Sequence, residues 1–137
     1  MSENQKLGIS PDVITEVTTF RDERQWKPFH NSKDLAISLS LEASELLEIF
    51  QWSADDVERP DRRDELADEL ADVLIYAILL ADHAHLNLDS IIRKKLKKNS
   101  LRYPVGRVTG LQEEYLALKE RARKNARANG GDDEELS

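Results

Sequence analysis

Apolar residues recur every three or four positions through most of this chain, which is the spacing of amphipathic helices. The first such segment begins at Ser10, a residue type that caps helices, and continues with Pro11, which suits the first helical position. The apolar residues that then fall on one helical face are Val13, Val17 and Phe20. Because the residue before a proline disfavours the helical conformation, we expect this helix to end before Pro28.

The second predicted helix, from about residue 32 to 50 and capped by Asn31 or Ser32, is apolar on two sides. Its main apolar stripe consists of Leu35, Leu39, Leu46, Ile49 and Phe50. A second stripe consists of Ile37, Leu41 and Leu47. A helix with two apolar sides must be covered on both. We therefore expect both sides to be buried, within a helical bundle or across a subunit interface.

Three further helices are predicted towards the C-terminus. The segment from about 61 to 86 contains LADELADVLIYAILLADHAHL, which is too apolar for a surface helix and predicts a central one. A basic helix is expected from 88 to 103, before Pro104, and a fifth helix with a narrow apolar stripe from 111 to 128. The acidic end, 129–137, is expected to be a disordered tail. These segments predict an all-α fold: a four-helix-bundle-like core with an additional C-terminal helix, in a single domain over residues 1–128.

Composition narrows the class of protein. The 137 residues carry a formal net charge of -7 and include no cysteine, so disulfides, zinc-thiolate sites and cysteine nucleophiles are excluded. The charge argues against general nucleic-acid binding, because phosphate backbones are held mainly by Lys and Arg. No apolar run approaches the roughly 20 residues needed to cross a bilayer, and the N-terminus has no apolar leader. We therefore expect a cytoplasmic protein without a membrane partner.

Two acidic pairs interrupt the most apolar segments. Glu42 and Glu45 lie three positions apart in the second predicted helix, and Glu69 and Asp72 repeat that spacing in the third. Residues at this spacing share one helical face. Four carboxylates in two interior helices repel one another and resist desolvation unless their pKa values rise or a cation binds. A hard divalent cation such as Mg²⁺, which prefers oxygen ligands, meets this need, and Mn²⁺ is the expected substitute.

Other interpretations of the acidic residues remain open. Acidic pairs at this spacing are also common on solvated helix faces, and Glu48 is a candidate for an additional ligand or base. A di-iron bundle requires Glu-x-x-His on two helices, and neither pair has a histidine partner. Asp82 and His85 have that spacing but stand alone, so His83 and His85 are interpreted as helix-end residues.

An ordered series of motifs carries a family resemblance. The series consists of WKPFH at 26–30, Glu42-x-x-Glu45, ELLEIFQW at 45–52, Glu69-x-x-Asp72 and KLKKNSLRYP at 95–104. Over roughly residues 20 to 105 it resembles the MazG-like all-α nucleoside triphosphate pyrophosphohydrolases, and within them the dCTP pyrophosphatase branch. This resemblance implies Mg²⁺-dependent hydrolysis of a (deoxy)nucleoside triphosphate to the monophosphate and pyrophosphate. The expected substrate is dCTP or a related or modified pyrimidine deoxynucleotide.

The resemblance also implies a role for particular residues. Catalysis and metal binding would fall to the four carboxylates, Glu42, Glu45, Glu69 and Asp72. Lys95 and Asn99 would contact the phosphates, assisted by Arg102 and Tyr103, and the nucleoside pocket would contain Trp26, His30, Trp52 and Tyr76. The family likeness further implies a homodimer or a homotetramer built from dimers. The alternative that remains open is a non-catalytic helical interaction module that retains the bundle.

Overall fold

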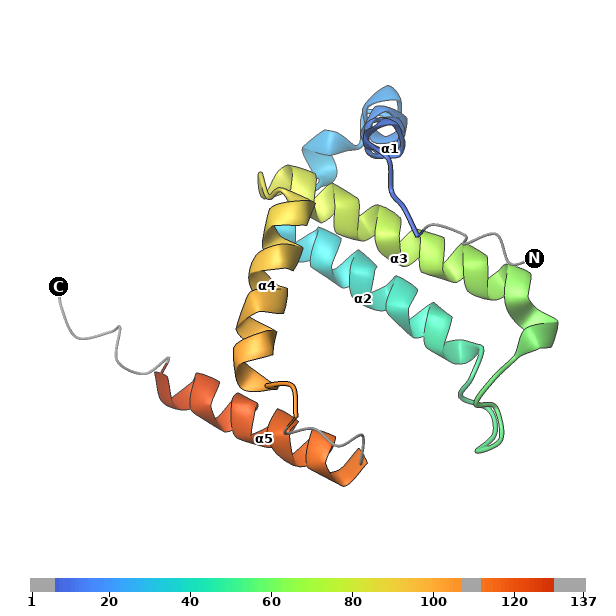
Figure 1. Ribbon diagram of the computed structural model, residues 1–137. Helices are drawn as coiled ribbons and strands as arrows, with labels where there is room; N and C mark the ends of the chain where they lie inside the picture. Colours follow the sequence, from blue (N-terminus) through green and yellow to red (C-terminus); the bar gives the residue numbers. More distant parts are fainter. Residues whose placement is uncertain (1–6, 107–111, 130–137) are drawn as a thin grey trace, which may run out of the picture. The chain divides into compact units, whose positions relative to one another are not determined.

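The computed structural model of the chain describes residues 7–106 and 112–129, and these residues form helices and no strands (Figure 1). The predicted all-α fold is confirmed. The helices are α1 (Pro11–Glu23), α2 (Ser32–Glu48), α3 (Arg63–His83), α4 (Leu88–Arg102) and α5 (Gln112–Asn129), with short 3₁₀ turns η1 (Lys27–Phe29) and η2 (Pro60–Arg62). The chain divides into two compact units, Met1–Leu88 and Asp89–Ser137. The single domain expected over residues 1–128 stays a prediction.

Side-chain caps hold the starts of α1 and α2. The side-chain oxygen of Ser10 accepts a hydrogen bond from the backbone N–H of Val13 at 3.3 Å, and that of Asn31 accepts one from the N–H of Asp34 at 2.9 Å. Pro11 occupies the first position of α1, where its missing N–H has no helical partner to lose. Each cap satisfies a donor that the first helical turn leaves unpaired. Both helices therefore begin where the sequence predicts.

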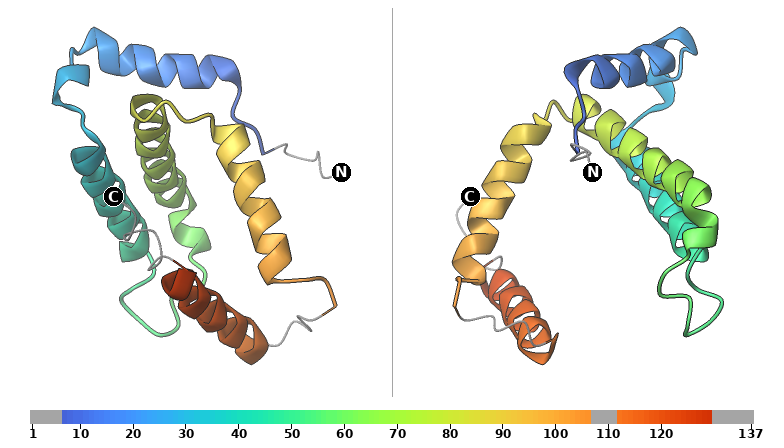
Figure 2. Two further views of the ribbon diagram at one scale, coloured as in Figure 1. Left: turned by 90° about the vertical axis from the view of Figure 1, so that its left-hand side faces the viewer. Right: turned by 45° about the vertical axis from the view of Figure 1, so that its right-hand side comes forward.

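The central helix of the first unit is α3. It packs along α2 and also contacts α1, and both views in Figure 2 show α2 and α3 side by side. The buried apolar side chains are Leu35 on α2, Ile49 at its end, and Ile78, Leu79 and Ala81 on α3. The predicted central position of the third helix is confirmed. Full burial of a Leu or Ile side chain contributes about 1.5–3 kcal/mol, so this packing stabilises the pair of helices that carries the acidic residues.

The C-terminal end of α3 is a tight turn at His85, which has a left-handed φ of 56°. The N–H of Leu86 donates to the carbonyl of Ala81 at 2.9 Å, which closes the helix in a Schellman motif. Gln25, with a φ of 55°, closes α1 in the same way. The third helix predicted from about 61 to 86 is therefore longer than α3 at both ends. At the C-terminal end, the sequence has no glycine to mark the turn at His85. At the N-terminal end, η2 precedes α3. The second predicted helix also runs two residues beyond α2.

A buried arginine joins the C-terminal ends of α1 and α3. Arg21 is only 3% exposed. Its Nη1 donates to Oδ2 of Asp82 at 2.6 Å, and its Nε donates to Oδ1 of Asp22 at 2.9 Å. Hydrogen bonds between ionised groups are stronger than those between neutral ones. Because Asp82 lies in the last turn of α3, the contact fixes α1 against the helix that carries Glu69 and Asp72.

The second unit contains α4 and α5. The ring of Tyr103, directly after α4, lies 6.4 Å from that of Tyr115 on α5 between centroids, and Nζ of Lys119 is 5.8 Å from the Tyr115 ring. The fourth helix ends one residue earlier than expected, and the predicted fifth helix is confirmed. Residue 111 and the acidic tail from residue 130 onward lie outside the described residues. Among the helices of residues 7–106 and 112–129, none has the length and apolar character of a membrane span.

Part of the apolar surface of α2 is uncovered in a single chain. Ile37, Leu41 and Leu47, which form the second stripe, are 47%, 60% and 58% exposed. The first stripe, by contrast, includes the fully buried Leu35 and Ile49. The chain thus covers one of the two apolar sides of α2, and coverage of the other by a second subunit stays a prediction.

We expect Arg21→Met to lower the free energy of unfolding by about 2 kcal/mol, because methionine fills the space but leaves Asp22 and Asp82 without their cation. The matched control is Arg24→Met, also at the end of α1. Arg24 is exposed, and its stacking on the Phe20 ring contributes less than about 1 kcal/mol. Urea unfolding followed by circular dichroism measures both losses. Equal losses in the two variants would contradict the role of Arg21.

Candidate active site

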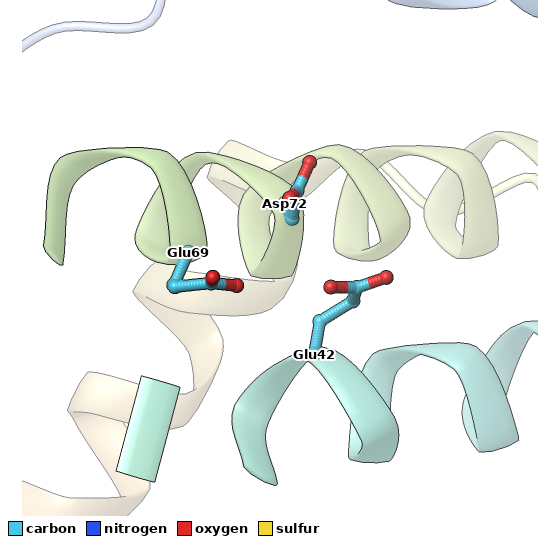
Figure 3. Close-up of side chains that lie close together, drawn as sticks. All are labelled: Glu42, Glu69 and Asp72. Atoms are coloured by element: carbon cyan, nitrogen blue, oxygen red, sulfur yellow. The ribbon is translucent and has the colours of Figure 1, made fainter. Parts of the chain in front are cut away.

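Three of the four predicted carboxylates meet between α2 and α3. Glu42 from α2 and Glu69 and Asp72 from α3 each offer an oxygen atom, and these atoms lie within 4.8 Å of one another. Figure 3 shows Glu42 extending from α2 towards α3, and Glu69 extending from α3 towards α2. The spacing of Glu69 and Asp72 places both on one side of α3, one turn apart. Packing of the two helices therefore brings together charges that are distant in the sequence.

Glu45 lies beside this group of three, and its influence is visible in the pKa values. Burial is the largest cause that raises the pKa of Glu42, followed by a hydrogen bond and charge repulsion from Glu45. Burial likewise raises the pKa of Glu69, with the charges of Glu45 and Asp72 next in importance. The charges of Glu45 and Asp72 thus act on both Glu42 and Glu69.

One oxygen of this cluster lacks a hydrogen-bonding partner. Oε2 of Glu69 is buried, and no group among the described residues donates a hydrogen bond to it. A buried polar atom without a partner costs free energy, and the cost is larger for an ionised group. A cation placed among the three carboxylates satisfies this oxygen and offsets the repulsion between the charges. Because all the available donors are carboxylate oxygens, the cluster fits a hard divalent cation.

A pocket of about 380 Å³ adjoins the carboxylates. Glu42 and Asp72 form part of its wall, and most of the remaining wall is apolar. The other lining residues are Val13, Glu16, Val17, Phe20 and Arg21 of α1, Trp26 and His30 around η1, and Ile75, Tyr76 and Leu79 of α3. Along both α1 and α3 these residues follow the spacing i, i+3, i+4, i+7, so each helix turns one face to the pocket. The pocket is thus a chamber that combines charged side chains with a mostly apolar wall.

His30 forms a polar point in this chamber. Its Nδ1 is buried, and it has no hydrogen-bonding partner among the described residues. Burial lowers the pKa of His30, and the charges of Arg21 and His83 lower it further. The imidazole is therefore neutral at pH 7, with one nitrogen available to a bound molecule.

The remaining candidate residues have different surroundings. Trp26, His30 and Tyr76 line the pocket, whereas Trp52, in the connector between α2 and α3, is 72% exposed and does not line it. Lys95, Asn99, Arg102 and Tyr103 belong to α4 and the residue after it, in the second unit. These four residues belong to a different unit from the carboxylates, and their roles stay predictions.

Sequence reasoning missed Glu16 as a pocket residue. Val13, Val17 and Phe20 were recognised as one apolar face of the first helix, but the carboxylate between them was not. The spacing of Glu16 could have identified it as a pocket residue. It is three positions from Val13 and four from Phe20, so it shares their helical face.

Comparison with known proteins decides the family. The sequence pattern of the MazG-like family matches residues 37–118, well over half of the chain. The chain belongs to the MazG-like family. This confirms the resemblance found in the sequence motifs. The matched residues extend from α2 into α5 and include the four carboxylates, but not α1, Trp26 or His30.

The chain is also similar to individual known proteins. The chain is 38% identical to rat dCTP pyrophosphatase 1 and 35% identical to the human protein of that name, in each case over 104 residues. The alignments cover 72% of this chain but only 61% of each relative. Its fold is similar to that of a pyrophosphatase from Archaeoglobus fulgidus, with a TM-score of 0.65 and 38% identity, over 72% of this chain and 99% of the other.

The raised pKa values predict how stability depends on pH. An acid whose pKa is higher in the folded state binds more protons when folded, so stability falls as the pH rises from about 4.5 through the folded pKa. In EDTA at pH 7, Glu69→Gln should therefore melt at a higher temperature than the wild-type chain. The difference should shrink towards pH 4, where Glu69 is protonated in both states.

Differential scanning fluorimetry across this pH range measures the effect. Glu48→Gln is the matched control, because Glu48 lies on α2 outside the group of three carboxylates and is exposed. It should show no comparable gain. A Glu69→Gln variant that is less stable than the wild-type chain at pH 7 would contradict the repulsion inferred here.

Proposed function

We propose that this member of the MazG-like family is a Mg²⁺-dependent nucleoside triphosphate pyrophosphohydrolase. Water attacks the α-phosphorus of a (deoxy)nucleoside triphosphate, the bond to the β-phosphate breaks, and the products are the monophosphate and pyrophosphate. The substrate we propose is dCTP or a related or modified pyrimidine deoxynucleotide. The observation that carries the proposal is the convergence of Glu42, Glu69 and Asp72, two of which, Glu42 and Asp72, also line a pocket with aromatic residues in its wall. The names of the rat and human relatives support the choice of dCTP.

Glu42, Glu69 and Asp72 would hold the metal ion, with Glu45 beside them as a further oxygen ligand. When bound, Mg²⁺ neutralises phosphate charge and polarises the phosphoryl group. Mn²⁺ fits the same oxygen ligands. One glutamate of this set orients the attacking water and accepts its proton, because a carboxylate within hydrogen-bonding reach is a competent general base.

The carboxylates themselves repel a triphosphate, so the protein must also supply positive charge. Lys95 and Asn99 lie one turn apart on α4 and can together offer a cation and an amide donor to the phosphates. Arg102 and Tyr103 follow at the end of the same helix and would assist them. Phosphoryl transfer depends mainly on such positioning and charge neutralisation.

The apolar chamber is suited to a nucleoside. Trp26 and Tyr76 offer ring faces on which a base can stack, and the Phe20 ring lies edge-on to Trp26 at 5.8 Å between centroids. The unpartnered Nδ1 of His30 can hydrogen-bond a polar atom of the nucleoside. The resemblance also implies that Trp52 contacts the nucleoside, although its exposed ring does not line this pocket of the single chain.

A homodimer, or a homotetramer built from dimers, is part of the same proposal. The exposed stripe of Ile37, Leu41 and Leu47 on α2 supports it, because a second copy of the chain would bury this apolar surface.

With dCTP and Mg²⁺, we expect the purified chain to release pyrophosphate and dCMP and no orthophosphate, which chromatography of the products measures. Glu69→Gln or Asp72→Asn should lower kcat by roughly two orders of magnitude or more, since each removes a charged metal ligand. The fold should persist, as judged by circular dichroism. Near-normal turnover in both variants would remove these residues from the site, and metal-independent turnover would contradict the proposed chemistry.

A separate prediction concerns α4. Lys95→Ala should reduce kcat/KM for dCTP by roughly tenfold or more, because the phosphates lose a charge-assisted contact. The matched control is Lys97→Ala, two positions along the same helix and therefore on a different face. Steady-state kinetics on the two variants compares them directly. Equal reductions would indicate a general effect of positive charge and would contradict a specific role for Lys95.

A further inference from the structure

Most polar groups of the pocket already have a function in the structure or in the proposed reaction. Arg21 is occupied by Asp22 and Asp82, and Glu42 and Asp72 belong to the metal cluster. The polar side chains that remain in the wall are Glu16, His30, Trp26 and Tyr76. Of these four, Glu16 is the carboxylate, and its role is not explained by metal binding or by the fold.

Glu16 is placed to contact a molecule inside the chamber. It lies on the face of α1 that also presents Val13, Val17 and Phe20 to the pocket. No hydrogen bond or ion pair to its carboxylate is found among the described residues, so its oxygens are open to a ligand. It comes from α1, whereas the metal cluster comes from α2 and α3. A triphosphate held at the cluster would therefore extend its nucleoside towards the wall that contains Glu16.

The chemistry of a carboxylate limits what it can recognise. An ionised carboxylate only accepts hydrogen bonds. Cytosine presents an exocyclic amino group on its edge, and a Glu side chain can accept a hydrogen bond from that group. Uracil and thymine carry a carbonyl oxygen at the same position, which would face the carboxylate without any proton between them. Two acceptors that face each other repel and form no hydrogen bond, so Glu16 would favour the amino group over the carbonyl.

We propose that Glu16 is a specificity-determining residue that selects nucleotides whose base carries an exocyclic amino group. The inference rests on the proposed function and extends it from the reaction to the choice of base. In this scheme the aromatic rings bind the base by stacking, which tolerates any base, and Glu16 supplies the discrimination.

The test compares dCTP with dUTP, which differ in the group at position 4 of the ring. The wild-type chain should have a higher kcat/KM for dCTP. Glu16→Gln should lower the ratio of the two kcat/KM values by about tenfold, because the glutamine amide can donate to the carbonyl of uracil as well as accept from cytosine. Glu23→Gln, the same substitution on the same helix outside the pocket, is the matched control and should leave the ratio unchanged.

The outcomes separate this inference from the proposed function. A wild-type ratio near one, or a ratio unchanged in Glu16→Gln, overturns the inference while leaving the hydrolase intact. If the chain hydrolyses no triphosphate, the proposed function fails, and equilibrium binding of dCTP and dUTP in the presence of Ca²⁺ then decides the role of Glu16. Tighter binding of dCTP that is lost in Glu16→Gln supports the inference, and equal binding of both nucleotides by the wild-type chain overturns it.

Discussion

Repulsion between carboxylates that two packed helices hold together is the constraint on which the site depends. The apolar contact between α2 and α3 places Glu42, Glu69 and Asp72 within 4.8 Å of one another and partly removes them from water. Burial and like charge both raise the pKa values of Glu42 and Glu69. The folding free energy of the helix pair thus maintains a local cluster that is unfavourable without a cation. Under the proposed function, a divalent cation bound between these carboxylates would offset their repulsion.

The same packing creates the space for a substrate. The ion pair of Arg21 with Asp82 fixes α1 against the end of α3, so that the faces of both helices enclose a chamber beside the carboxylates. The wall of this chamber contains both carboxylates and aromatic rings. Under the proposed function, a nucleotide would place its base against the aromatic rings and its phosphates near the carboxylates, where a bound cation would offset the repulsion between like charges. Under the proposed function, substrate recognition and catalysis would both depend on the contact between α1 and α3 that Arg21 maintains.

Much of this arrangement was predictable because it depends on local signals. The caps at Ser10 and Asn31 and the apolar stripes predicted where helices begin, and the two acidic pairs at helical spacing predicted the cluster of carboxylates. The turn at His85 was not predictable, since it needs a left-handed residue that is usually glycine. Arg21 was also missed, because an arginine near a helix end is usually solvated, and its burial results from a long-range contact with Asp82. Glu16 was overlooked because a charged residue on an apolar stripe can be recognised as a pocket residue only when the helix on the other side of the pocket, α3, is known.

The most direct measurement is the location of Mn²⁺ in crystals of the full chain, determined from its anomalous scattering. We expect one or more peaks between α2 and α3, within coordination distance of oxygen atoms of Glu42, Glu69 and Asp72. Peaks confined to other surfaces, or none at a Mn²⁺ concentration that supports turnover, would contradict the claim that the clustered carboxylates form a cation site.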